Sequence, residues 1–290
     1  PARVTPGEAT IRAVAVRGSE TFREGYQVIA YNHIQTRHLF HPAASQVKII
    51  DVTIPPNRQV GYVMGSGDEV ADAIRQLGAT VTMLSPEEVA FGDLSKYTTI
   101  VLGIRAYEKR PDVRAYNQRL LDFARNGGHL VVQYNKTPMN QLGGGQAGPP
   151  PGMFTGDGGR GGGRGSAPPA SPYVPYPGGI TSNRVTVEEA PIRILEDGTA
   201  ELTQPNSITA ADFDNWVQER GLYFFGANDP RYTDILAATD PWPNNPGEKK
   251  GMLTVAKIGD GTWTYVGLGL WRQLPAGVPG AYRILANLIR

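Results

Sequence analysis

After its first 57 residues, the chain alternates short apolar segments with amphipathic ones, and this alternation constrains the fold more than any other feature. Four apolar segments are typical of buried strands, namely Gln59–Met64, Thr80–Leu84, Thr99–Gly103 and His129–Tyr134. Helical segments separate them, and Asp112–Asn126 is the longest of these. The pattern predicts an open, mostly parallel α/β sheet with helices on both faces, because parallel strands need crossover connections.

The last third of the chain predicts further strands and two helices. Gly259-Asp260-Gly261 has the composition of a tight hairpin turn, so the strands on either side of it are expected to pair antiparallel. The sheet is therefore expected to be mixed, parallel first and antiparallel later. The predicted strands are Gly221–Phe225, Asp234–Ala238, Met252–Ile258 and Thr262–Leu268, and the predicted helices are Ile208–Glu219 and Pro279–Ile289.

Residues 1–56 predict a small all-β segment that precedes the α/β domain, which is expected to cover residues 57–290. Thr10–Arg17, Tyr26–Tyr31 and Gln46–Thr53 are rich in β-branched and aromatic residues, and Pro55-Pro56 closes the segment. A few strands with one apolar face need a cover. We therefore expect the end of a β-sandwich whose other strands lie upstream of Pro1, in a processed or fragmentary chain.

Composition excludes several functions and locates one irregular segment. The net charge of +1 comes from scattered charges and predicts no nucleic-acid partner. No apolar run is long enough for membrane insertion, and the absence of cysteine excludes disulfides and thiolate metal sites. The 36 glycines and 24 prolines concentrate in Gly143–Gly179. We interpret this segment as a variable surface insertion, although its Arg160 and Arg164 resemble an RNA-binding Gly-Arg element.

Polar and aromatic residues follow several of the predicted strands. In an open α/β sheet, ligands bind beyond the carboxyl ends of the strands, where such residues converge. Aromatic faces suit the C–H surfaces of a sugar, and polar side chains suit its hydroxyls, so a glycan is the predicted ligand. Helix capping, turn formation and structural ion pairs are the alternative roles. The candidate ligand-binding residues are Ser66, Asp68, Arg105, Tyr107, Asn135, Lys136, Trp271 and Arg272.

Other clusters carry less chemistry. The histidines His33, His38 and His41 are spaced by five and three residues, which does not place them on one strand face, so surface positions are favoured over a metal site. Phe213 and Trp216 are expected to bury together, leaving neighbouring carboxylates exposed or paired with an arginine. A serine nucleophile is not supported, because the glycines around Ser66 are its immediate neighbours. No catalytic or metal-binding residue is predicted.

Five stretches together resemble the C-terminal region of bacterial LmbE/PIG-L-type deacetylases, which are exported proteins with a zinc domain first. That region resembles the class I glutamine-amidotransferase-like fold of ThuA-like proteins. The resemblance spans the chain from about Tyr26 onward. The stretches are Val60–Val70, Gly103–Tyr107, Leu130–Asn135, Ile208–Phe224 and Trp271–Arg283.

The resemblance implies an accessory module without the family's chemistry. The zinc domain's Ala-His-Pro-Asp-Asp motif has no counterpart, since His41-Pro42 is followed by Ala43-Ala44. A glutaminase-type enzyme would place a cysteine at the Asn135-Lys136 turn, and this chain has none. Zinc is thus expected only in a separate catalytic domain, and no cofactor in this chain.

The expected function is a non-catalytic accessory or carbohydrate-binding module of an exported N-acetyl-sugar deacetylase. Its expected partners are a glycan and either the upstream deacetylase domain or neighbouring chains. One alternative is a ThuA-like sugar-active hydrolase or isomerase that uses Asp68, Lys136 or a bound metal. Another alternative is a structural component of an extracellular assembly, built by strand addition or loop packing.

Overall fold

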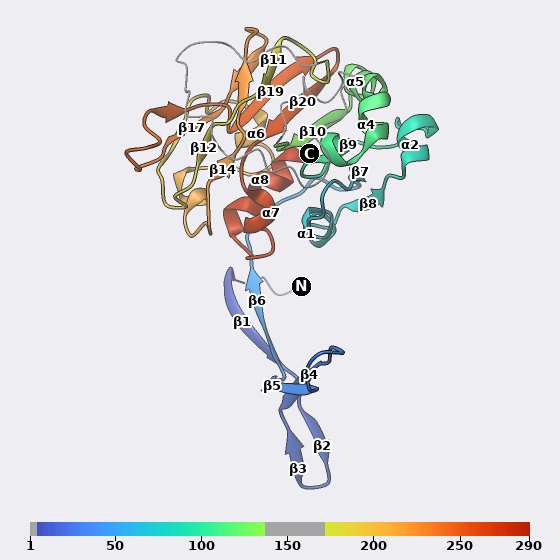
Figure 1. Cartoon of the computed structure of the whole chain (residues 1–290), viewed down its shortest axis with the longest axis vertical. Coiled ribbons are helices and arrows are strands. Elements are labelled where there is room, and N and C mark those ends of the chain that lie inside the picture. Colours follow the sequence, from blue (N-terminus) through green and yellow to red (C-terminus); the bar gives the residue numbers. More distant parts are fainter. Residues whose placement is uncertain (1–4, 137–171) are drawn as a thin grey trace. The chain divides into compact units, whose positions relative to one another are not determined.

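The computed structural model describes residues 5–136 and 172–290 (Figure 1). Within it the chain forms two compact units, Pro1–Asp51 and Val52–Arg290. The sequence analysis placed a boundary a few residues later, between residues 56 and 57. Most of the predicted insertion, residues 143–171, lies outside the described residues.

The first unit consists of three antiparallel strand pairs, β1–β6, β2–β3 and β4–β5. The predicted strand Thr10–Arg17 is two strands, because β1 pairs with β6 whereas β2 turns back onto β3. The bounds are β1 (Gly7–Arg12), β2 (Ala15–Arg17), β3 (Glu20–Phe22), β4 (Glu24–Ile29), β5 (Arg37–Pro42) and β6 (Ala44–Ile49).

No residue between positions 5 and 51 is buried. In the β1–β6 pair, Ala9 lies opposite Val47 on one face, and Glu8 lies opposite Lys48 on the other. One face of this pair is thus apolar, as in a sheet that packs on one side. Large apolar side chains stay exposed throughout the unit, namely Ile11, Val14, Val16, Phe22, Tyr26, Val28, Tyr31, Ile34, Leu39 and Phe40.

The second unit is built on a seven-stranded sheet with the order β16-β19-β20-β10-β9-β7-β8. The five strands from β8 to β20 are parallel, whereas β19 and β16 are antiparallel to their neighbours. The predicted mixed sheet is therefore confirmed. The bounds are β7 (Gln59–Val63), β8 (Thr80–Met83), β9 (Thr99–Leu102), β10 (His129–Gln133), β16 (Tyr232–Asp234), β19 (Leu253–Ile258) and β20 (Gly261–Val266).

Small antiparallel sheets extend this unit: β11–β15, β12–β14 and β13-β17-β18. They form between Gly178 and Lys249, so that β11 includes the last two residues of the predicted insertion, and strands were expected there only in part. Their strands are β11 (Gly178–Ile180), β12 (Arg184–Val185), β13 (Ile192–Ile194), β14 (Gly221–Leu222), β15 (Phe225–Ala227), β17 (Leu236–Thr239) and β18 (Glu248–Lys249).

Helices connect the strands, and two predictions need correction. The predicted helix Asp112–Asn126 is divided at Tyr116 into α4 and α5. The predicted helix Ile208–Glu219 is only the 3-10 helix η2, because Asn215 and Gln218 have left-handed φ angles of 57° and 67° that a helix cannot accept. The bounds are α1 (Val70–Gln76), α2 (Pro86–Phe91), α3 (Ala106–Lys109), α4 (Pro111–Ala115), α5 (Asn117–Arg125), α6 (Ala200–Thr203), η2 (Ala210–Phe213), α7 (Leu270–Gln273) and α8 (Pro279–Leu288).

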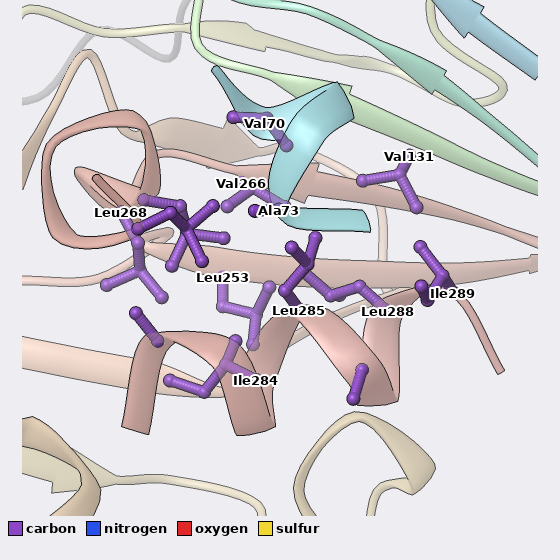
Figure 2. Packing of buried hydrophobic residues seen from close by; sticks show 14 of the residues in the cluster. Val70, Ala73, Val131, Leu253, Val266, Leu268, Ile284, Leu285, Leu288 and Ile289 are labelled. Atoms are coloured by element: carbon purple, nitrogen blue, oxygen red, sulfur yellow. The ribbon is translucent and has the colours of Figure 1, made fainter. Parts of the chain in front are cut away.

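Successive side chains of the central strands enter two different cores. On β9, Val101 faces the core that contains α1 and α8, whereas Ile100 and Leu102 face the core that contains α2, α4 and α5. Figure 2 shows the first core, where Ile284 and Leu285 of α8 pack in the same cluster as the α1 and strand side chains. The sheet is thus covered on both faces, which holds the loops at its carboxyl edge on a rigid base.

His129 begins β10 and is buried, and its Nε2 shares a 2.9 Å hydrogen bond with Thr264 Oγ1. Burial, with a smaller contribution from Arg290, lowers the pKa of His129 from 6.5 to about 3. The unfolded chain would take up this proton near pH 6.5, while the folded chain would stay neutral until about pH 3. Stability that is fully present above pH 6.5 is therefore lost progressively as the pH falls toward 3.

We expect the free energy of unfolding to decrease by about 3 kcal/mol as the pH falls from 6.5 to 4, because of this histidine alone. In a His129→Gln variant, position 129 cannot take up the proton. The unfolding free energy of this variant should therefore decrease less as the pH falls. Denaturant titrations at several pH values measure both slopes. Parallel pH dependences for the two proteins would contradict the assignment.

Candidate functional site

The turn from β9 into α3, at the carboxyl edge of the sheet, is strained. The backbone of Arg105 has the left-handed angles φ 59° and ψ 26°, which residues other than glycine seldom adopt. Its amide donates to the carbonyl of Tyr134 after β10, at 2.8 Å. The amide of Ser66, after β7, donates to the carbonyl of Ile104 at 2.9 Å. Three strand ends are thus fixed to one another at Arg105.

Glu108 ties the same region together. One carboxylate oxygen accepts from Arg105 Nε and Nη2 at 2.8 and 2.6 Å, and the other accepts from the amide of Lys136 at 2.5 Å. The Glu108 side chain is 8% exposed, whereas that of Arg105 is 33% exposed. The carboxylate therefore lies behind the guanidinium, which is the solvent-facing member of the pair.

Three aromatic rings adjoin this ion pair. Tyr134 follows β10, Tyr223 follows β14, and Trp271 lies in α7, beyond β20. The ring centroids of Tyr134 and Trp271 are 4.3 Å apart, and Tyr223 stacks on Tyr134 at 5.9 Å with 12° between the planes. All three side chains are partly exposed. We call Tyr134, Tyr223 and Trp271 the aromatic rim.

A second ion pair lies beside the aromatic rim. Arg272 donates to Glu219 at 2.7 Å and to Gln218 Oε1 at 2.6 Å, and its guanidinium carbon is 5.7 Å from the ring centroid of Trp271. Arg272 is again the more exposed partner, at 38% against 14% for the Glu219 side chain. Gln218 and Tyr223 both have left-handed φ angles, of 67° and 55°, so this segment is also held in a strained conformation.

The Tyr134 hydroxyl lies within the electric field of both ion pairs. Burial raises its pKa, Glu108 and Glu219 raise it further, and Arg105 and Arg272 oppose them. The hydroxyl is therefore protonated and neutral at physiological pH. The aromatic rim and the two Arg–Glu pairs thus form one connected site of rings, hydrogen-bond donors and shielded carboxylates.

Two predicted residues are not exposed at this site. Tyr107 is fully buried, because the first turn of α3 directs it inward, where its hydroxyl donates to Asn117 Oδ1 at 2.6 Å. Asn135 is also fully buried and accepts from the Tyr107 amide at 3.1 Å. The left-handed strand-to-helix turn at this edge of the sheet lies at Arg105. Both side chains have supporting roles.

Asp68 also has a structural role, since its carboxylate accepts hydrogen bonds from within the chain. Its carboxylate accepts from the Tyr62 hydroxyl at 2.5 Å, from the Val70 amide at 3.1 Å and from the Ile104 amide at 3.2 Å. These two amides are therefore already bonded to Asp68. Ser66 remains exposed in the adjacent loop.

The structure thus brings together Arg105, Trp271 and Arg272 of the predicted set, with Lys136 exposed nearby at the end of β10. Glu108, Glu219, Tyr134 and Tyr223 were not among the predicted ligand-binding residues, although Tyr134 ends the predicted strand His129–Tyr134, after which such residues were expected. The three-residue spacing of Arg105 and Glu108 at a helix start was a usable signal. Glu219 and Arg272 are 53 residues apart, and no sequence pattern connects them.

Neither a metal site nor a membrane span is found in residues 5–136 and 172–290. No group of three or more histidine, aspartate or glutamate side chains there is arranged to hold a metal ion, His33, His38 and His41 included. No helix in the same residues has the length and apolar character needed to cross a bilayer.

No protein-family model matches the chain, and the comparison with curated proteins finds no match. Several solved structures are similar in part, including the following three. A putative ThuA-like protein from Bacteroides uniformis is 10% identical with a TM-score of 0.43, over 81% of this chain and 91% of that one. A cytoplasmic protein from Salmonella typhimurium is 10% identical with a TM-score of 0.40, over 97% and 94% of the two chains. A β-galactosidase from Rahnella is 15% identical with a TM-score of 0.40, and the match spans 73% of this chain but 29% of that one.

Likenesses of this size identify no function. The resemblance to LmbE/PIG-L-type deacetylases stays an expectation from the sequence. The residues of the site itself are therefore the basis for a functional proposal.

Proposed function

We propose that this chain is a carbohydrate-binding module and that the aromatic rim with its two Arg–Glu pairs is the binding site. In the setting that the sequence resemblance implies, it would be the accessory module of an exported N-acetyl-sugar deacetylase. The observation that carries the proposal is the contact of Tyr134 with both Tyr223 and Trp271, beside two exposed guanidinium groups.

The chemistry of a sugar matches these groups. Apolar C–H faces of a pyranose ring cover aromatic rings, while hydroxyl oxygens accept hydrogen bonds from guanidinium groups. Left-handed residues within the rim and beside it, Tyr223 and Arg105, support a functional rather than a purely structural arrangement, since strain of this kind concentrates at binding sites.

Replacing Trp271 with alanine is expected to weaken sugar binding at least about tenfold, because the ring that packs on Tyr134 is lost. Calorimetric titration of the intact chain with a panel of oligosaccharides, including the trimer of N-acetylglucosamine, measures the affinity. Trp242→Ala is the matched control, since Trp242 is an exposed tryptophan that takes no part in the rim.

The proposal fails if the unchanged protein binds no sugar in the panel, or if the two tryptophan variants bind equally well. Product formation from a sugar by the chain alone would instead favour the alternative, a ThuA-like hydrolase or isomerase. Activity assays on the same panel therefore accompany the titrations.

A further inference from the structure

The charges around the aromatic rim are arranged in a way that limits its ligand. Four charged side chains act on the Tyr134 hydroxyl, and they are Arg105, Arg272, Glu108 and Glu219, two of each sign. Each arginine lies within 2.6–2.7 Å of its own carboxylate. The formal charge of this group is therefore zero, although it is rich in hydrogen-bonding atoms.

The two members of each pair are not equally accessible. The Arg105 and Arg272 side chains are 33% and 38% exposed, against 8% and 14% for Glu108 and Glu219. A ligand approaching the rim thus meets N–H donors first, with carboxylates directly behind them. It can offer acceptor oxygens without having to separate either pair.

A charged ligand would meet opposition from this arrangement. A carboxylate on the ligand would have to compete with Glu108 or Glu219 for the same guanidinium and would take the positive counter-charge away from a largely buried carboxylate. An ammonium group would face the exposed guanidinium groups directly. Neutral hydroxyl and acetamide oxygens avoid both costs.

We propose that the rim selects uncharged glycans, such as N-acetylated sugars, and discriminates against both acidic and amino sugars. The inference rests on the proposed carbohydrate-binding function and adds the ligand class to it. It also implies that binding of an uncharged glycan is insensitive to salt, because the ligand brings no charge to the site.

Three trimers with the same β-1,4-linked pyranose backbone test the inference: the N-acetylglucosamine trimer, its deacetylated cationic form and a glucuronate trimer. The intact chain is expected to bind the uncharged trimer at least about tenfold more tightly than either charged one. Its affinity should change less than about twofold between 50 mM and 500 mM salt. Calorimetry measures both quantities.

Two reciprocal variants test the role of the pairs. Glu219→Gln leaves Arg272 without its counter-charge and should strengthen binding of the glucuronate trimer about tenfold. Arg272→Gln removes the counter-charge of Glu219 and should strengthen binding of the cationic trimer about tenfold. Melting temperatures of both variants confirm that the fold is retained, and the trimer series on the unchanged chain tests the inference even if a variant does not fold.

The possible failures are distinct. If no trimer and no other sugar binds, the carbohydrate-binding function fails and the inference falls with it. If sugars bind but a charged trimer binds as well as the uncharged one, or affinity falls steeply with salt, carbohydrate binding stands and the charge selection is overturned.

Discussion

Replacing Arg220 with alanine is expected to lower the unfolding free energy by about 4 kcal/mol. The Arg220 side chain is buried, and its guanidinium donates to the carbonyls of Ala190, at 2.8 Å, and of Phe213. It also lies over the Trp216 ring, with 5.7 Å between the guanidinium carbon and the ring centroid. Truncation would leave two buried carbonyls without donors and a cavity beside Trp216.

The loss corresponds to a fall in melting temperature of roughly 10 °C for a unit of this size. Scanning calorimetry measures it. Arg193→Ala is the control, because the Arg193–Glu248 ion pair is exposed and should shift the melting temperature by less than about 2 °C. Equal shifts for the two variants would refute the structural role given to Arg220.

Burial lowers the pKa of Arg220 to about 10, and nearby acidic residues, Asp214 foremost, oppose this shift. The residue therefore remains charged at neutral pH while it holds the segment between η2 and β14. Glu219 and Tyr223 of the binding site lie in or next to that segment. We expect Arg220→Ala to weaken sugar binding as well, because the second ion pair would lose its support.

The second large effect is expected for Gly65→Ala, about 3 kcal/mol of destabilisation. A Cβ at position 65 would lie 2.0 Å from the carbonyl oxygen of Ile104 and 2.9 Å from the amide nitrogen of Ala106. Both are backbone atoms of the turn that holds Arg105, so no side-chain rotation can relieve the contact. The loops after β7 and β9 would have to separate.

Denaturant unfolding measures this loss, and sugar titration measures the accompanying loss of affinity. Gly198→Ala is the control, because a Cβ at Gly198 meets no atom within 4 Å. It should change stability by less than about 1 kcal/mol. If the Gly65→Ala protein were as stable as the Gly198→Ala protein, the loops after β7 and β9 would not be in the close contact described at Gly65.

The sheet was predictable because its strands are marked by local patterns. His129–Tyr134 and Thr99–Gly103 are short apolar runs between helical segments, and the hairpin at Gly259-Asp260-Gly261 fixed the antiparallel end. The segment from Ile208 to Glu219 has a helix-like composition, but the sequence does not reveal its left-handed residues. There the tertiary contacts of Arg220 and Gln218 override local preference.

The candidate site was only partly predictable for a related reason. Residues after parallel strands were known to converge, which pointed to Arg105 and Trp271. Whether a side chain turns outward or inward depends on the first dihedral angles after the strand, and these placed Tyr107 in the core. The Glu219–Arg272 pair depends on two distant loops meeting, which only the folded chain determines.

The strand pairs in residues 5–51 have no interior of their own, and this has a thermodynamic consequence. The hydrogen bonds of its strand pairs bury no apolar core that would offset the entropy lost when its backbone becomes ordered. A covering surface from outside these residues would therefore stabilise it. If that surface belongs to another molecule, the ordered fraction of residues 5–51 depends on the concentration of that molecule. Dilution would then disorder this unit under conditions in which Val52–Arg290 stays folded.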